Sequence, residues 1–338
     1  MKRTRRILFQ AVFALLFVTL PAHAVDVTLT VDEHVDRPSA LAAAQSNLAA
    51  VLTEINRAQK AKESVSVKNL RMDEFAKKSL ARLWAVTPFY CDDEEVVERC
   101  WVFKNGTMMV SHIPLIITPE DENFGLGTYQ EAVVEFDTKG QLIDFRFALD
   151  AQTAESMERC GTVVDKEKQM IILQYVERFR TAYNMKDLET IKNMFSDDAL
   201  IITGKVVMTK KLTDSENAAF KVEYTKQNKQ QYINNLKMAF LRNKWIDVKF
   251  SQIGENGEQG GCQGITRSTV DPTKYGVRLH QSWKSSNYSD EGYLFLLWDF
   301  PENGGDPIIH VRTWQPEWAG GKRQQPDDDI STLGGFDL

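Results

Sequence analysis

The hydrophobic period of this chain changes from helical to strand-like twice, and this repeated change limits the possible folds more than any single motif. Apolar residues first recur every three to four positions, as in amphipathic helices, and then alternate with polar residues, as in antiparallel strands. The same change follows a second set of helices later in the chain. We therefore expect two α+β units, which fits a length of 338 residues, because single cores rarely grow beyond about 250 residues.

The first unit is predicted to contain a strand, two helices and four further strands. Residues 25–31 alternate, Pro38 opens a helix with an apolar stripe, and a second helix over residues 72–84 ends before Pro88. Asn105-Gly106 is a typical hairpin turn. The four strands are expected at 99–103, 108–117, 129–136 and 142–149.

The second unit begins with helices that Asp165 and Asp187 are expected to cap. A short strand at 199–203, an irregular polar stretch to residue 225 and a third helix at 228–241 come next. Four strands are then predicted at 245–253, 275–283, 292–300 and 308–314. Glycine-containing turns join the last three, so we expect them to be consecutive antiparallel neighbours.

This order resembles the cystatin-like cone fold of the nuclear transport factor 2 superfamily. The resemblance lies in "YVERFRTAYNMKDLETIKNMFSDDALIITGKVV" (175–207), "YSDEGYLFLLWDF" (288–300) and "IIHVRTWQP" (308–316). It covers roughly residues 163–318 and implies a curved antiparallel sheet packed on helices around a hollow. The first unit shares the two-helix opening and is interpreted as an abbreviated second copy. The whole chain is similar to uncharacterised exported bacterial proteins with this C-terminal domain.

The N-terminus has the pattern of a cleaved signal peptide. Four basic residues precede an apolar run of about fourteen residues, which is shorter than the ~20 that a membrane span needs. Ala22-His23-Ala24 supplies small residues for cleavage before Val25. We therefore expect an exported protein, periplasmic or secreted, with a signal peptide at 1–24, an α+β domain at 25–160, the cone-fold domain at 161–318 and a mobile tail at 319–338.

The cysteines bear on the same question of compartment. In an oxidising compartment the four cysteines allow two disulfides, and Cys91 and Cys100 are the plausible local pair. Cys160 and Cys262 are the other two. Free buried thiols are the alternative. The spacing matches no zinc motif.

The last predicted strand carries the candidate catalytic residues. Strict alternation would place residues 308, 310, 312 and 314 on one face and the odd-numbered residues on the other. If the first face lines the hollow, His310 would be a general base, Arg312 an anion clamp, and Asp299 would orient the imidazole. Tyr183 would complete the group. The alternative is that this face is solvated or meets a partner. His280 is expected to be exposed.

Aromatic residues of the second unit are candidates for a ligand pocket. They suit an apolar pocket and suit core packing equally well. The candidate ligand-binding residues are Tyr224, Tyr293, Trp298 and Trp314.

No reaction motif appears in the sequence. There is no glycine-rich phosphate loop, GxSxG or HExxH, so we expect neither a cofactor nor a metal, and a net charge of −6 argues against nucleic acid. The favoured hypothesis is a non-catalytic envelope module that binds a small ligand or a protein partner. It is expected to be a monomer whose two units pair internally through their sheets.

The alternative is a pocket enzyme doing acid/base chemistry of isomerase, dehydratase or hydrolase type. Superfamily enzymes of these types use the hollow between the sheet and the helices as a pocket. Convergence of Asp299, His310 and Tyr183 would favour the enzyme, and their dispersal would favour the module.

Overall fold

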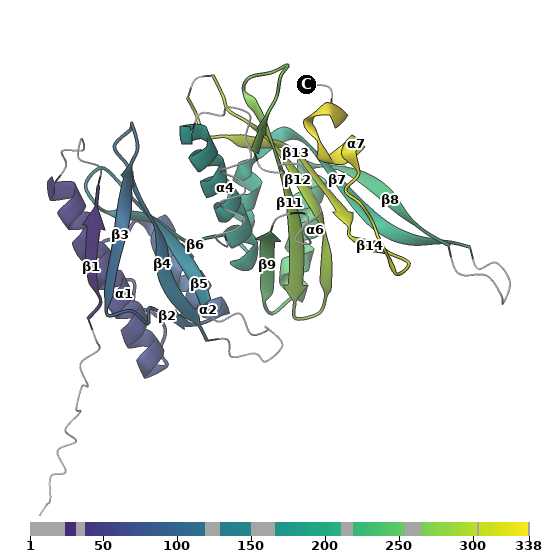
Figure 1. The fold of residues 1–338 in the computed structure, drawn as a ribbon. Coiled ribbons are helices and arrows are strands. Elements are labelled where there is room, and N and C mark those ends of the chain that lie inside the picture. The colour runs from purple at the N-terminus through teal and green to yellow at the C-terminus, as the bar shows by residue number, and fades with distance from the viewer. Residues whose placement is uncertain are drawn as a thin grey trace, which may run out of the picture.

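The computed structural model describes residues 24–336 except 32–37, 119–128, 150–165, 211–218, 252, 254–264 and 303. Residues 1–23 of the predicted signal peptide, the predicted helix cap Asp165, and Cys160 and Cys262 therefore lie outside the described residues. Within them, two α+β domains lie side by side, with helix α4 standing between their sheets (Figure 1). No helix in these ranges is both long enough and apolar enough to cross a membrane.

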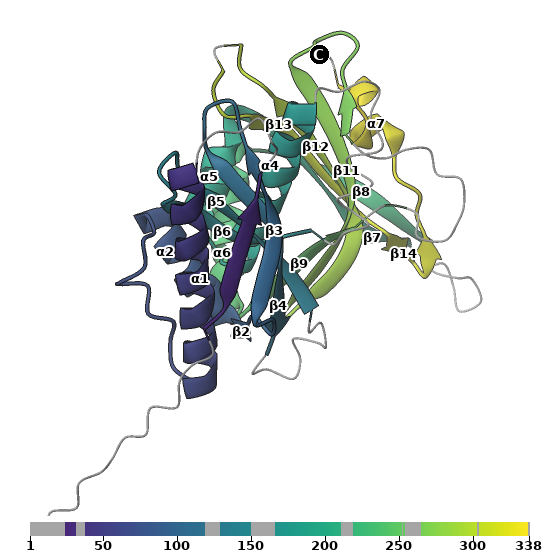
Figure 2. The same cartoon turned by 60° about the vertical axis from the view of Figure 1, so that its left-hand side comes forward.

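The N-terminal domain has helices α1 and α2 on one face of a sheet (Figure 2). The apolar stripe of α1 is fully buried against that sheet, and the Asp73 carboxylate caps α2 by accepting from the Ala76 N–H. The strand order is β1-β3-β4-β5-β6, with β1 parallel to β3 and β2 beside β4. The elements are β1 (Asp26–Thr30), α1 (Pro38–Ala61), α2 (Glu74–Val86), β2 (Phe89–Tyr90), β3 (Glu95–Val102), β4 (Met108–Ile117), β5 (Tyr129–Phe136) and β6 (Leu142–Phe147).

The C-terminal domain wraps a long sheet around three helices. The strand order is β10-β11-β12-β13-β7-β8, with β9 beside β11 and β7 parallel to β13. Strands β11, β12 and β13 are consecutive antiparallel neighbours, as predicted. The elements are α4 (Lys166–Asn184), α5 (Leu188–Met194), β7 (Phe195–Lys210), β8 (Ala219–Asn228), α6 (Lys229–Arg242), β9 (Ile246–Ser251), β10 (Ile265–Arg267), β11 (Lys274–Ser285), β12 (Ser289–Asp299) and β13 (Ile308–Pro316). This order is that of the cone fold.

Two sequence expectations about these sheets differ from the structure. The polar stretch before residue 225 was expected to be irregular but contains β8, an edge strand exposed on both faces. The alternation of Phe220, Val222 and Tyr224 with polar residues was a strand signal that the sequence analysis missed. The abbreviated-copy interpretation is not confirmed. In the N-terminal sheet the parallel partner β1 precedes the helices, whereas in the C-terminal sheet both parallel strands follow α4 and α5.

The C-terminal segment packs on the outer face of the sheet, the face turned away from the helices. It forms β14 (Trp318–Ala319), β15 (Lys322–Arg323), α7 (Asp328–Ser331) and a 3-10 turn η2 (Leu333–Gly335). Thr313 Oγ1 donates to the Ile330 carbonyl at 2.6 Å, and the Phe336 ring stacks on Phe295 at 5.7 Å. The prediction of a mobile tail therefore differs from the structure, because the outer face of β12 and β13 offers an apolar surface that this segment covers.

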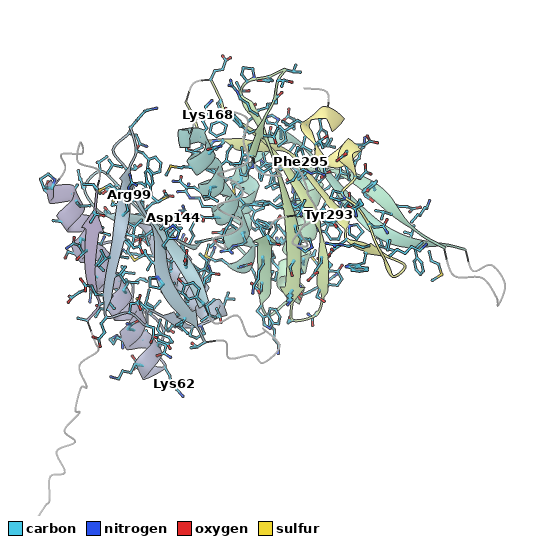
Figure 3. The ribbon with its side chains drawn as sticks, in the orientation of Figure 1. Lys62, Arg99, Asp144, Lys168, Tyr293 and Phe295 are labelled. Carbon is cyan, nitrogen blue, oxygen red and sulfur yellow. The ribbon has the colours of Figure 1, made fainter. Side chains whose placement is uncertain are left out.

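The two domains meet through a buried ionic cluster of five residues. Arg146 on β6 lies 2.6 Å from Glu135, 2.7 Å from Asp144 and 3.1 Å from Glu177 on α4. Arg178, also on α4, reaches Glu135 and Asp144 at 2.6 and 2.8 Å. Figure 3 labels Asp144 on the side of the N-terminal sheet that faces α4. The contact is thus between a sheet and a helix, not between two sheets as expected.

The predicted local disulfide is also absent. Cys91 and Cys100 are free thiols in the N-terminal core, and burial raises the pKa of each to about 11. At neutral pH both are therefore protonated and behave as small apolar side chains.

Candidate functional site

A bulge on β13 breaks the alternation on which the catalytic candidates depended. Val311 pairs with Leu297, whereas Ile309 pairs with Trp298, so His310 is the extra residue. Ile309 belongs to the core against the helices. Arg312 lies on that inner face too, over the ring of Tyr232 at 5.2 Å. The single predicted face of even-numbered residues therefore does not exist.

The bulge places His310 between two carboxylates. Its Nε2 lies 3.3 Å from Asp299 Oδ2 and its Nδ1 lies 3.5 Å from Asp198 Oδ1. Hydrogen bonding from the Ser196 hydroxyl, with a smaller contribution from His310, lowers the pKa of Asp198. The expected pairing of Asp299 with His310 is present, but neither residue lines any of the three cavities described here.

Arg312 and Tyr183 form a second, separate group inside the hollow. The hydroxyls of Tyr183 and Tyr232 share a short hydrogen bond, and Arg312 Nη2 lies 3.5 Å from Gln281 Oε1. Burial, then the neighbouring Tyr232, raises the pKa of Tyr183 well above its usual value, so the phenol stays neutral. The four catalytic candidates are thus dispersed into two pairs, His310 with Asp299 and Arg312 with Tyr183.

An aromatic cavity of about 610 Å³ opens at the mouth of this hollow. Trp283, Trp314, Trp318 and Tyr288 contribute its rings. Gly292 makes room for them, because a Cβ there would lie 2.8 Å from carbons of the Trp314 ring. The remaining lining residues include Lys205, Lys284, Ser289, Asp290 and Glu291. We call this space the mouth cavity.

Two residues that line the mouth cavity, Trp314 and Asp290, and one that does not, Arg312, each keep a buried polar atom without a hydrogen-bond partner among the described residues. These atoms are Trp314 Nε1, Asp290 Oδ1 and Arg312 Nε. The other oxygen of Asp290 accepts from the Tyr288 hydroxyl at 2.8 Å, and burial raises the pKa of Asp290. Leaving such groups unpaired costs about 1–3 kcal/mol each. The cavity wall therefore offers a ligand one donor, Trp314 Nε1, and one acceptor, Asp290 Oδ1.

Of the four aromatic ligand candidates, only Trp314 lines a cavity among those described. Tyr224 and Tyr293 lie on the outer face and donate to Asp327 and to the Gln324 carbonyl of the C-terminal segment. Trp298 is fully buried in the core against Tyr175. Sequence reasoning missed Trp283 and Asp290, although they lie directly opposite each other on neighbouring strands.

His280, expected to be exposed, is half-buried on the outer face. Its Nε2 lies 3.1 Å from Glu317 Oε2 and its Nδ1 lies 3.4 Å from the Ser251 hydroxyl. Ligand-type atoms of His280, Glu291 and Glu317 lie within 4.8 Å of one another, a spacing that suits a metal ion. However, Arg323 Nε already donates to Glu317 at 2.7 Å, so this carboxylate has a cationic partner within the chain.

No family model matches the chain, and no curated protein matches it. Among solved structures, Bd1075 of Bdellovibrio bacteriovorus is 14% identical over 47% of this chain and 42% of that chain, with a TM-score of 0.32. An NTF-2 like protein of unknown function from Shewanella oneidensis MR-1 is 12% identical over 44% of this chain and 98% of that chain, with a TM-score of 0.30.

A putative dehydratase from the NTF2-like family of Streptomyces avermitilis is 9% identical over 44% of this chain and 96% of that chain, with a TM-score of 0.30. The match with Bd1075 spans less than half of the length of that protein. At these identities and TM-scores, the assignment to the cone fold rests on the strand order and helix placement of this chain.

Proposed function

We propose that this protein is an exported, non-catalytic cone-fold module that binds a small ligand in the mouth cavity. Export is inferred from the leader pattern at residues 1–24. Ligand binding is supported by one observation above all: Trp314 and Asp290, in the wall of an aromatic cavity, keep buried polar atoms that have no partner among the described residues. A ligand that forms hydrogen bonds with these atoms would offset the free energy that their desolvation costs.

The chemistry of the mouth cavity favours a sugar-like ligand. Flat rings of Trp283 and Trp314 suit the apolar face of a saccharide, and the polar edge of such a ring both donates and accepts hydrogen bonds. Trp314 Nε1 is a donor in the cavity wall, and Asp290 Oδ1 is an acceptor there. The proposed ligand class is therefore a neutral polyhydroxylated ring.

A second candidate function is the pocket enzyme. The observation that favours it is the position of His310 at a bulge between Asp198 and Asp299, since bulges occur often beside active sites. The module is preferred because this group lies apart from Tyr183 and Arg312 and lines none of the described cavities.

The test is a titration of the full chain with chitotriose and maltotriose, followed by tryptophan fluorescence and calorimetry. We expect Trp314→Phe, which keeps a ring but removes the N–H, to weaken binding about fivefold to tenfold, as the loss of one buried hydrogen bond implies. Trp101→Phe is the matched control, because that ring lies exposed on β3 of the other domain. Failure of both saccharides to bind, or equal affinity in both variants, would contradict the proposal.

A further inference from the structure

A second cavity, of about 410 Å³, lies between the two domains. Both domains build it: α2, β4, β5 and β6 on one side, and α4 and β9 on the other. Its size falls in the usual range for small-molecule sites, which are often found at domain interfaces. The walls are mainly apolar, and include Leu83, Val86, Ile117, Phe147, Leu149, Ile246 and Phe250. We call it the interdomain cavity.

Three buried polar side chains of different character also line this cavity. Arg180 is 5% exposed, Asp247 is 7% exposed and Thr87 is 3% exposed. Arg180 Nη2 donates to the Ala148 carbonyl at 2.8 Å. The Thr87 hydroxyl has no hydrogen-bond partner among the described residues. A cation, an anion and a free hydroxyl are thus held within otherwise apolar walls.

Asp247 is the group that most needs a partner. Burial raises the pKa of its carboxyl although three cations, Lys249, Arg180 and Lys284, act in the opposite direction. Among the described residues its ion pair is with the exposed Lys249, whose Nζ lies 3.8 Å away. The other acid of the cavity, Glu131, is already engaged, because it accepts from Tyr129 at 3.1 Å and contacts His112 Nδ1 at 2.8 Å. Asn184 is likewise held by the backbone of Val248. A ligand ammonium would therefore be directed to Asp247.

We propose that the interdomain cavity binds an apolar zwitterion, a free amino acid or a short peptide with aliphatic side chains. The ligand ammonium would meet Asp247, the ligand carboxylate would meet Arg180, and the Thr87 hydroxyl would add one hydrogen bond. The aliphatic side chain of the ligand would pack against the apolar walls formed by α2 and β9. Because the ligand touches both domains, it stabilises their contact by mass action. This site is independent of the mouth cavity.

Calorimetric titration of the full chain with L-leucine, L-leucyl-L-leucine and N-acetyl-L-leucine amide tests the proposal. We expect one or both zwitterions to bind and to raise the melting temperature, and the uncharged amide to bind at least tenfold more weakly. Comparing the affinities of leucine and its dipeptide shows whether the cavity prefers a free amino acid or a short peptide. Absence of binding by both zwitterions at millimolar concentrations, or equal binding of the amide, would overturn the proposal.

Variants separate binding from folding. Thr87→Val should weaken zwitterion binding severalfold without lowering the melting temperature, because the hydroxyl has no partner in the described part of the chain. Val86→Trp should abolish binding by filling the cavity, since Val86 is half-buried in its wall. Asp92→Asn, an exposed carboxyl before β3, is the control and should bind normally. Unchanged affinity in both Thr87→Val and Val86→Trp would refute the location.

Discussion

Two buried arginines, Arg146 between the domains and Arg312 inside the hollow, have opposite surroundings. Arg146 is 1% exposed and lies within 3.1 Å of three carboxylates. Arg312 is 6% exposed, and its described neighbours are Tyr183, Tyr232 and Gln281. The carboxylate of Asp290 also acts on it electrostatically. Its Nε has no partner among the described residues.

The comparison separates a charge that holds the structure together from a charge that is less fully paired. A buried ion is tolerated when its partners satisfy it, as they do at the domain interface. A buried cation with an unused donor, such as Arg312, is less fully compensated, because that donor has lost its water without gaining a partner among the described residues. Burial alone therefore does not mark a functional residue in this protein, whereas incomplete pairing beside a cavity does.

The largest expected effect comes from exchanging each arginine for methionine. Arg146→Met leaves Glu135, Asp144 and Glu177 buried with too little positive charge, so we expect a loss of about 3–5 kcal/mol in the free energy of unfolding. Arg312→Met breaks no close ion pair among the described residues and should cost about 1 kcal/mol or less, while weakening saccharide binding through the loss of its electrostatic effect on Asp290. Urea unfolding of both variants measures the difference. Equal losses would show that the two arginines have the same role.

A smaller effect, of opposite sign in the two regions, is expected from pH. At Asp144, burial alone would raise the pKa, but Arg178 and Arg146 more than offset it, and the pKa is lowered. Ionised Asp144 therefore stabilises the fold above its unfolded pKa of about 3.9, and this stabilisation is lost as the pH falls through the folded value. At Asp290, burial raises the pKa, so its contribution is present below about 3.9 and is lost as the pH rises.

Asparagine variants make this contrast measurable. Compared with the wild type, Asp144→Asn should be less stable at pH 7, and its deficit should shrink as the pH falls below about 4. Asp290→Asn should be more stable than the wild type at pH 7, and its advantage should vanish at acid pH. Urea unfolding across this pH range gives both curves. If Asp290→Asn were less stable than the wild type at neutral pH, the Asp290 carboxylate would stabilise the fold as Asp144 does, and the contrast would be wrong.

The helices and most strands could be predicted because their apolar residues face one core. The predicted ranges 108–117 and 129–136 coincide with β4 and β5. The interface cluster could not be predicted, because Asp144 and Arg146 alternate with Phe145 and Phe147 and so have the pattern of a solvated strand face. What buries these charges is α4, and no local pattern in β6 indicates that distant contact.

The candidate site was only partly predictable, for a different reason. Asp299 lies beside His310, as expected for residues on neighbouring strands, but it is the bulge at His310 that brings them together, and the same bulge separates the pair from Arg312. The aromatic candidates were chosen by residue type, and burial in the core or contact with the C-terminal segment removed three of them from any described cavity. Side-chain direction after a bulge depends on backbone register that period-two reasoning does not contain.

The smallest expected effect concerns His310. Its ring is partly exposed and its two carboxylate contacts are at 3.3 and 3.5 Å, so such ion pairs contribute little. His310→Ala should change the free energy of unfolding by no more than ~0.5 kcal/mol and leave ligand binding intact. Chemical unfolding and the saccharide titration check this. A variant that folds and binds normally but loses a turnover present in the wild type would establish the enzyme.

Helix α4 has no exposed side chain from Lys168 to Asn184, because one side packs in the cone-fold core and the other covers the charged face of β5 and β6. The helix that covers the charged face of the N-terminal sheet therefore comes after that domain in the chain. During synthesis the buried arginine and acids of that domain stay hydrated until residue 178 arrives, so the first domain reaches its final stability only after the second has begun to fold. We accordingly expect heat to unfold both domains in one cooperative transition.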